Sequence, residues 1–159
     1  MSRTSSLFVA ACMALTSLCG TRHAAAAPQS PKPTVQDVID AIREVETGGN
    51  PNPTNAVGDG GRSIGPWQIS RPYYDDALWI LNQQLEATPS YSVAAKSDVW
   101  GPKIMLAYWT RYCPEAVTNV DAQTLARTHS GGLFGPSRSA TLPYWHKVQA
   151  VLLKKGFAV

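Results

Sequence analysis

The chain has 159 residues and a formal net charge of +3 at pH 7, with 44% apolar and 16% charged residues. That length is enough for one domain with its own core and excludes two domains of ordinary size. The composition is ordinary for a globular protein.

An apolar run follows a short N-terminal stretch that carries one charge, Arg3. The run LFVAACMALTSLCG is too short for a stop-transfer helix, and the small residues of TRHAAAAPQ follow at the spacing of a cleavage site. We therefore predict a secretory signal peptide over residues 1–26, which makes the mature protein secreted or periplasmic. A lipid anchor on Cys19 is the alternative, but Leu18 before it is too large for a good lipobox.

Cleavage at this point changes the charge and the cysteine count. It removes two arginines and no acidic residue, so 12 basic residues face 11 acidic ones and the mature charge is about +1. A nucleic-acid partner then has no electrostatic support. Only Cys113 remains, so the domain has no internal disulfide, and we interpret Cys113 as a buried thiol. No later run approaches the roughly 20 apolar residues of a membrane span.

The mature chain begins with a Pro-rich tether, residues 27–33, followed by one predicted domain over residues 34–157. Apolar residues recur at helical spacing from 35 to 45 after a capping Thr34, and the glycines at 48 and 49 end this helix. Short β-prone pieces then flank the Gly-Asp-Gly-Gly turn at 58–61. This pattern predicts a small antiparallel β-hairpin.

Caps and apolar spacing predict four further helices. They cover residues 71–87 after a capping Ser70, 99–113, 121–132 with Asp121 as cap, and 141–156 with Thr141 as cap. The outline is an α+β fold, mostly helical with one hairpin close to the first helix.

Three acidic residues near the hairpin are candidates for chemistry. Glu46 lies four residues after Ile42 on the apolar face of the first predicted helix, whereas Glu44 belongs to its polar stripe. A carboxyl group near apolar surface has a raised pKa, as a general acid near neutral pH needs. The alternative is that Glu46 only ends the helix.

Asp59 lies in the predicted hairpin turn, 13 residues after Glu46. An Asp in a Gly-rich turn is common for conformational reasons alone. A glutamate at a helix end with a carboxylate on an adjacent hairpin is, however, the arrangement that glycoside hydrolysis uses. Asp75 and Asp76 are rivals for the second carboxylate, but their place in the first turn of a helix already explains them.

Three blocks of the sequence resemble the invertebrate-type lysozyme family, also called the destabilase family. They are REVETGGN, SIGPWQIS and ARTHSGGLFGPSRSATLPYWHKVQ, the last at residues 126–149. The resemblance covers most of residues 35–150. It implies a lysozyme-like α+β fold with the hairpin beside the catalytic cleft. It also implies a bacteriolytic hydrolase that cleaves the β-1,4 bond between N-acetylmuramic acid and N-acetylglucosamine in peptidoglycan.

The resemblance places the catalytic glutamate at Glu46 and the aspartate at Asp59, the latter within about one residue. Glu46 is then the general acid and Asp59 the nucleophile or stabiliser of the oxocarbenium ion. The predicted substrate-binding residues are Trp67, Gln68, Ile69, His129, Gly131, Gly132, Tyr144 and Trp145. We expect Trp67, Tyr144 and Trp145 to stack on sugars, although core packing explains Trp145 equally well. We expect a monomer that needs no metal and no cofactor.

Two departures from the family matter. The family is rich in disulfides, whereas the mature chain keeps one cysteine. Some members are credited with isopeptidase activity, but Ser130 beside His129 is not enough to assign a nucleophile.

Two other functions fit the same pattern. A lytic transglycosylase also pairs a glutamate at a helix end with a Gly-x-x-Gln-Ile strand, and it releases 1,6-anhydro products. A non-catalytic module that binds peptidoglycan or chitin oligomers is the second alternative, although Glu46 is present.

Overall fold

The computed structural model describes residues 29–84 and 87–159, so the predicted signal peptide and the first two tether residues lie outside the described residues. The described part of the chain folds into α-helices around one small antiparallel sheet. The helices are α1 (Val35–Thr47), α2 (Arg71–Leu81), α3 (Tyr91–Ala94), α4 (Trp100–Tyr112), α5 (Pro114–Asn119), α6 (Ala122–Gly131) and α7 (Leu142–Lys154). The prediction of a mostly helical α+β fold is confirmed.

The sheet has three strands of two residues each, β1 (Val57–Gly58), β2 (Ser63–Ile64) and β3 (Ile69–Ser70), in the order β1-β2-β3. The predicted hairpin is the β1–β2 pair, closed by the 3₁₀ turn η1 (Asp59–Gly61). The third strand extends the prediction. It pairs with β2 because the chain reverses at Gly65 and Gln68, whose φ angles are +79° and +48°.

Helix α1 has the boundaries that its sequence predicts. The Thr34 and Asp37 side chains form a capping box, in which each accepts from the other residue's backbone N–H. Gly48 ends the helix at φ +58°, a left-handed conformation that costs glycine little. The end of α1 is therefore fixed one residue after Thr47, which determines where Glu46 points.

The later helices differ from prediction at their ends. Helix α2 ends at Leu81 and continues as a 3₁₀ turn at Asn82–Gln84, and α5 was not predicted. Thr141 takes the N-cap position of α7, as predicted, but its side chain makes no capping hydrogen bond. Its backbone is helical, and its hydroxyl donates instead to the Gly135 carbonyl at 2.7 Å, within the 3₁₀ helix η3 (Gly132–Ser137).

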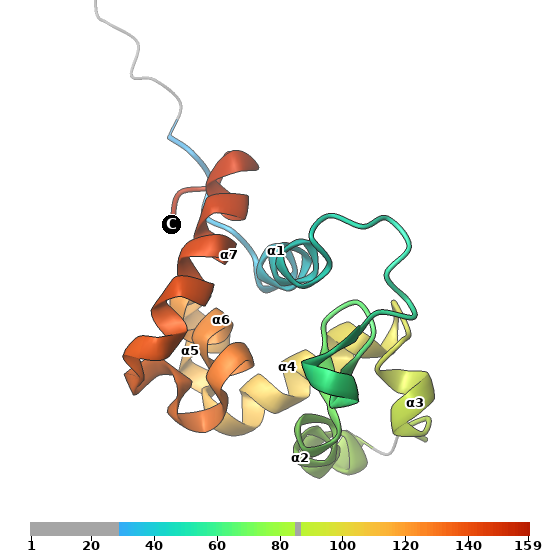
Figure 1. Cartoon of the computed structure of the whole chain (residues 1–159). Helices are drawn as coiled ribbons and strands as arrows, with labels where there is room; N and C mark the ends of the chain where they lie inside the picture. Colours follow the sequence, from blue (N-terminus) through green and yellow to red (C-terminus); the bar gives the residue numbers. More distant parts are fainter. Residues whose placement is uncertain (1–28, 85–86) are drawn as a thin grey trace, which may run out of the picture.

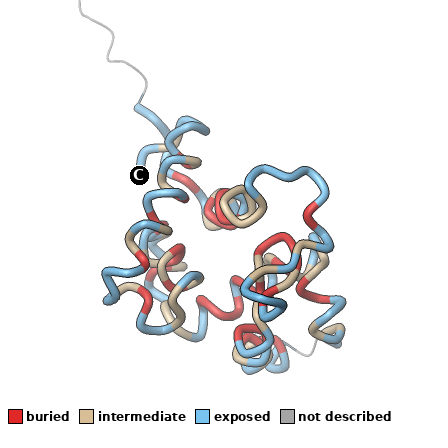
Figure 2. Tube along the Cα trace, in the orientation of Figure 1, coloured by how far each residue is buried: buried red, intermediate tan, exposed pale blue. Residues whose placement is uncertain are grey.

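The core lies between the helices, with α2 packed on α4 and α1 packed on α7. Figure 2 shows the buried segments of these helices facing inward. In Figure 1, α1 runs between α7 on one side and the sheet on the other, and α2 lies below the sheet. This sheet is thus held between α1 and α2, where its turns lie close to the end of α1.

The two ends of the described chain meet. The backbone N–H of Ala158 donates to the Pro31 carbonyl at 2.9 Å, and Pro33 is buried. Part of the predicted tether therefore packs against the domain. Among the described residues, no helix combines the length and apolar character that crossing a membrane requires.

Candidate active site

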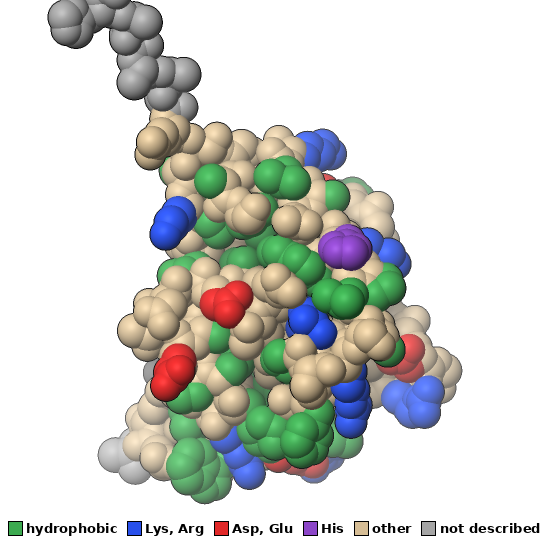
Figure 3. Space-filling model, turned by 90° about the vertical axis from the view of Figure 1, so that its left-hand side faces the viewer, with side chains coloured by type: hydrophobic (Ala, Val, Ile, Leu, Met, Phe, Trp, Pro, Cys, Tyr) green, Lys and Arg blue, Asp and Glu red, His purple; other side chains and the backbone are tan. Residues whose placement is uncertain are grey.

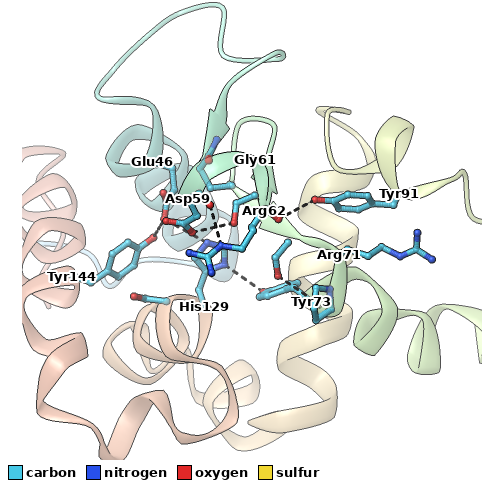
Figure 4. Close-up of a pocket in the computed structure, with 14 residues that line it drawn as sticks. Glu46, Asp59, Gly61, Arg62, Arg71, Tyr73, Tyr91, His129 and Tyr144 are labelled. Carbon is cyan, nitrogen blue, oxygen red and sulfur yellow. Dashed lines mark hydrogen bonds and ion pairs between the residues drawn. The ribbon is translucent and has the colours of Figure 1, made fainter.

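A cleft of about 860 Å³ lies between the sheet, the start of α2 and the C-terminal ends of α1 and α6 (Figure 4). Its lining residues come from six segments of the sequence. They are Glu46, Asp59, Gly61, Arg62, Ser63, Gln68, Ser70, Arg71, Pro72, Tyr73, Tyr91, His129, Ser130 and Tyr144. We call Glu46, His129 and Tyr144 the helical wall, and Asp59, Arg62, Ser63 and Gln68 the hairpin wall.

Glu46 lies in the last turn of α1 with its side chain 20% exposed. The Tyr144 hydroxyl donates to its Oε1 at 2.7 Å. Burial raises the pKa of Glu46, the nearby charge of Asp59 adds to this, and the Tyr144 hydrogen bond opposes it. Glu44 instead lies 3.7 Å from Lys155 outside the cleft. The helix therefore separates the two glutamates as the spacing predicts.

His129 lies behind Glu46, with only 4% of its side chain exposed. Its Nε2 is 3.7 Å from Glu46 Oε1, and its Nδ1 is 3.4 Å from the Tyr73 hydroxyl. Burial lowers the pKa of His129 to about 4, so the imidazole is neutral near pH 7. The contact with Glu46 is consequently between neutral His129 and the carboxyl group and contributes no ion pair near neutral pH.

Asp59 is exposed and enters the cleft from the hairpin wall. Its φ of +51° is in the left-handed region, which Asp tolerates better than most residues. The Ser63 hydroxyl donates to Asp59 Oδ2 at 3.3 Å, and Arg62 Nε donates to the Asp59 carbonyl at 3.0 Å. Figure 4 shows Asp59 and Glu46 pointing into the cleft from two different elements. Two carboxyl groups with different surroundings thus share one site.

Three of the predicted substrate-binding side chains fit this cleft. Gln68, His129 and Tyr144 line it, and Gln68 Nε2 donates to the Gly65 carbonyl at 2.8 Å. Ile69 is fully buried below the cleft, and its carbonyl accepts from the Tyr91 hydroxyl at 2.9 Å. Ile69 therefore supports the hairpin wall from below, and its buried side chain cannot contact a ligand.

Trp67 is placed in the core. Its side chain is 2% exposed, and its indole Nε1 donates to the Ile39 carbonyl in α1 at 3.1 Å. A Cβ at Gly101 would come within 2.3 Å of the indole, which shows how closely α4 covers it. The expected stacking of Trp67 on sugar does not fit this position. Trp67 instead joins the sheet to α1.

Trp145 and the two glycines also lie away from the cleft lining. Trp145 is 6% exposed and lines a separate hollow with Pro33 and Val159, in accord with its core-packing alternative. A Cβ at Gly131 would lie 2.6 Å from the Thr141 side chain. The space beside Gly131 is therefore filled by the Thr141 side chain of the protein and is not open to a ligand. Gly132, at φ +71°, faces the Tyr108 hydroxyl.

Several lining residues were not predicted from the sequence, chiefly Arg62, Arg71, Tyr73 and Tyr91. Ser70 was predicted to cap α2, and its side chain does accept from the Tyr73 N–H. The first turn of a helix that directly follows a sheet must lie beside that sheet. The predicted cap at Ser70 therefore indicated that Arg71 and Tyr73 lie near the cleft. Tyr91 comes from a helix, α3, that no pattern indicated.

Outside the cleft, Cys113 is a half-buried free thiol whose pKa is raised by burial. Within residues 29–84 and 87–159, no group of three His, Cys, Asp or Glu side chains is placed to hold a metal ion. On the face shown in Figure 3, acidic and basic side chains are interspersed, so this face presents no continuous patch of one charge.

Comparison of the fold with solved structures finds lysozymes of bivalve molluscs. The lysozyme of Tapes japonica is 25% identical, with a TM-score of 0.63, and the match covers 80% of this chain and 99% of that one. The inhibitor-bound lysozyme of Meretrix lusoria is 22% identical with a TM-score of 0.60, over 80% and 99%.

A complex of that lysozyme with Aeromonas hydrophila PliI also matches, at 23% identity and a TM-score of 0.60. It covers 83% of this chain and 99% of that one. The sequence matches no family model and no curated protein. The chain therefore has a lysozyme-like fold, related in structure to the invertebrate lysozymes.

Proposed function

We propose that the protein is an exported muramidase of the invertebrate lysozyme type, which hydrolyses the β-1,4 bond between N-acetylmuramic acid and N-acetylglucosamine. The observation that carries the proposal is the largely buried Glu46 carboxyl, hydrogen-bonded by Tyr144, in one cleft with the exposed Asp59. The lysozyme-like fold and the N-terminal sequence pattern support the activity and the export, respectively.

In the first step Glu46 acts as the general acid. Its raised pKa favours the protonated form, and the Tyr144 hydroxyl occupies Oε1, which leaves Oε2 to carry the proton. Protonation of the glycosidic oxygen lets the leaving sugar depart with a hydroxyl group. Glu46, now ionised, then takes a proton from the water that completes hydrolysis.

Asp59 acts on the other side of the broken bond. In water-accessible surroundings its carboxylate remains available to attack the anomeric carbon or to stabilise the oxocarbenium ion. The half-buried Gln68 and the backbone of the hairpin wall offer donors and acceptors for N-acetyl groups. Peptidoglycan strands are the proposed substrate, chitin oligomers are the proposed second ligand, and the proposed enzyme works as a monomer.

Mass spectrometry of the products tests this proposal. Purified protein is incubated with peptidoglycan, and the soluble fragments are analysed for their ends, with Glu46→Gln as a matched control. Fragments with reducing ends that disappear in the control support hydrolysis. 1,6-Anhydro ends would instead identify a lytic transglycosylase, and the absence of fragments would indicate a binding module.

A further inference from the structure

The cleft contains two arginines with different surroundings. Arg71 Nε lies 2.8 Å and 2.9 Å from the two carboxylate oxygens of Asp75, so its charge is compensated by its own helix. Arg62 Nε donates to the Asp59 backbone carbonyl at 3.0 Å, and no carboxylate among the described residues forms an ion pair with it. Figure 4 shows Arg62 pointing into the cleft and Arg71 pointing away from Glu46.

The backbone at Arg62 and Ser63 is fixed by a contact with Tyr91 and by strand pairing. The Tyr91 hydroxyl lies 2.9 Å from the Ile69 carbonyl and 3.5 Å from the Arg62 carbonyl. Ser63, the next residue, is buried and pairs with Ser70 in the sheet. With Nε bound to Asp59, the terminal nitrogens of the guanidinium remain for a ligand, in the geometry that binds a carboxylate through two hydrogen bonds.

The charges along the cleft would otherwise disfavour an acidic ligand. His129 is neutral near pH 7, and Arg71 is paired with Asp75. Burial raises the pKa of Glu46, so this carboxyl group adds no positive charge and carries its negative charge less readily than an exposed one. Asp59 would repel a second carboxylate. Arg62 is therefore the cleft cation available to attract one. Of the glycans proposed as substrates, chitin is neutral, whereas muramic acid units carry a carboxylate on the lactyl group or on the attached peptide.

We infer that Arg62 is the specificity-determining residue that recognises a carboxylate carried by the muramic acid unit, so the cleft prefers acidic glycans to neutral ones. This inference rests on the proposed function for its choice of glycan. It assigns Arg62 a role in binding only, and the transfer of protons stays with Glu46.

Binding measurements in the Glu46→Gln background test the inference without turnover. Titration calorimetry compares peptide-free muramic acid oligosaccharides, peptide-bearing ones, the same glycans with amidated carboxyl groups, and chitin oligosaccharides. We expect tighter binding of the carboxylated glycans by at least about 10- to 100-fold, because even one of the two hydrogen bonds to a charged group supplies this much. Comparison of peptide-free with peptide-bearing glycans identifies which carboxylate is bound.

The added substitution Arg62→Gln should abolish this preference, because glutamine can still donate to the Asp59 carbonyl but carries no charge. The matched Arg71→Gln should retain it. The inference is overturned if Glu46→Gln binds carboxylated and amidated glycans equally, or if the two arginine substitutions reduce the preference equally. Because binding is measured apart from product formation, failure of the hydrolysis proposal appears only in the wild-type products.

Discussion

The two walls of the cleft hold their carboxyl groups in opposite ways. On the helical wall, Glu46 is mostly buried, receives a hydrogen bond from Tyr144 and lies against neutral His129. On the hairpin wall, Asp59 is exposed in a turn with a left-handed backbone and receives one 3.3 Å hydrogen bond from Ser63. The fold therefore makes one carboxyl group reluctant to ionise and leaves the other in contact with water.

The difference follows from how each wall is supported. Helix α1 packs on α6 and α7, and His129 and Tyr144 from those two helices contact Glu46 and cover most of its side chain. The sheet has only two-residue strands. Trp67 links it to α1, and Tyr91 links it to α3. A general acid needs surroundings that disfavour its charged form, whereas a nucleophile needs a carboxylate that the substrate can reach.

The largest effect should come from Glu46→Gln, which removes the acid and keeps the acceptor for Tyr144. We expect release of reducing ends to fall by about 10³- to 10⁴-fold, within the range of general acid catalysis, with little change in melting temperature. The control is Glu44→Gln, in the same turn of α1 but 3.7 Å from Lys155 and outside the cleft lining. Equal losses in both variants would contradict a special role for the helical wall.

Asp59→Asn tests the hairpin wall. Asparagine tolerates the same left-handed backbone, so the turn should survive while the charge is lost. We expect the rate of hydrolysis to fall by about 10²- to 10³-fold, the scale of one lost electrostatic stabiliser. Unchanged activity would make Asp59 a turn residue, and 1,6-anhydro products would then favour the transglycosylase.

Site residues that are placed by their position along one helix could be predicted from the sequence. Site residues that are placed by contact between distant segments could not. Helical spacing was sufficient to place Glu46 on the apolar face and Glu44 on the polar one. It could not reveal Tyr91, because nothing local indicates that a four-residue helix will contact the hairpin.

Trp67 shows the same limit of prediction from sequence, because it was expected in the cleft and lies in the core. An aromatic residue next to Gln68 is equally suited to a sugar and to a core. The choice depends on Gly101, more than 30 positions later in the sequence, where the missing side chain makes room for the indole. The fold class was predictable because caps and apolar spacing are local signals, whereas the third strand depended on one turn in which Gly65 and Gln68 both have positive φ angles.

His129, in the helical wall, makes the free energy of unfolding depend on pH. Its pKa falls from an ordinary 6.5 to about 4 in the folded protein. The stability it contributes is therefore present above pH 6.5 and is lost as the pH falls from 6.5 through about 4. We expect a loss of about 2 kcal/mol, less than the full pKa shift because a buried site relaxes on charging.

Chemical denaturation between pH 7 and pH 4 measures this loss, and the Glu46→Gln background removes the opposite contribution of the raised Glu46 pKa. In that background His129→Asn should flatten the dependence, since asparagine does not titrate. Asparagine also keeps a polar atom near the Nδ1 position that faces Tyr73. A slope that persists after this substitution would assign the pH dependence to other groups.

The smallest effect should come from Tyr144→Phe, which removes the hydrogen bond on the helical wall without removing the ring. That bond lowers the pKa of Glu46, so its loss should raise the pKa. The alkaline limb of the activity profile, where the acid loses its proton, should then move to higher pH. One hydrogen bond contributes about 1 kcal/mol, so we expect a shift of about one pH unit or less and a rate loss of about 3- to 10-fold.

Tyr91→Phe is the matched control, because it removes a hydroxyl that supports the hairpin wall through the Ile69 carbonyl. It should leave the alkaline limb where it is, since Tyr91 makes no hydrogen bond to Glu46 among the described residues. If both substitutions move this limb equally, the pKa of Glu46 depends on the shape of the whole cleft. A shift in Tyr144→Phe alone assigns the tuning of the acid to the helical wall.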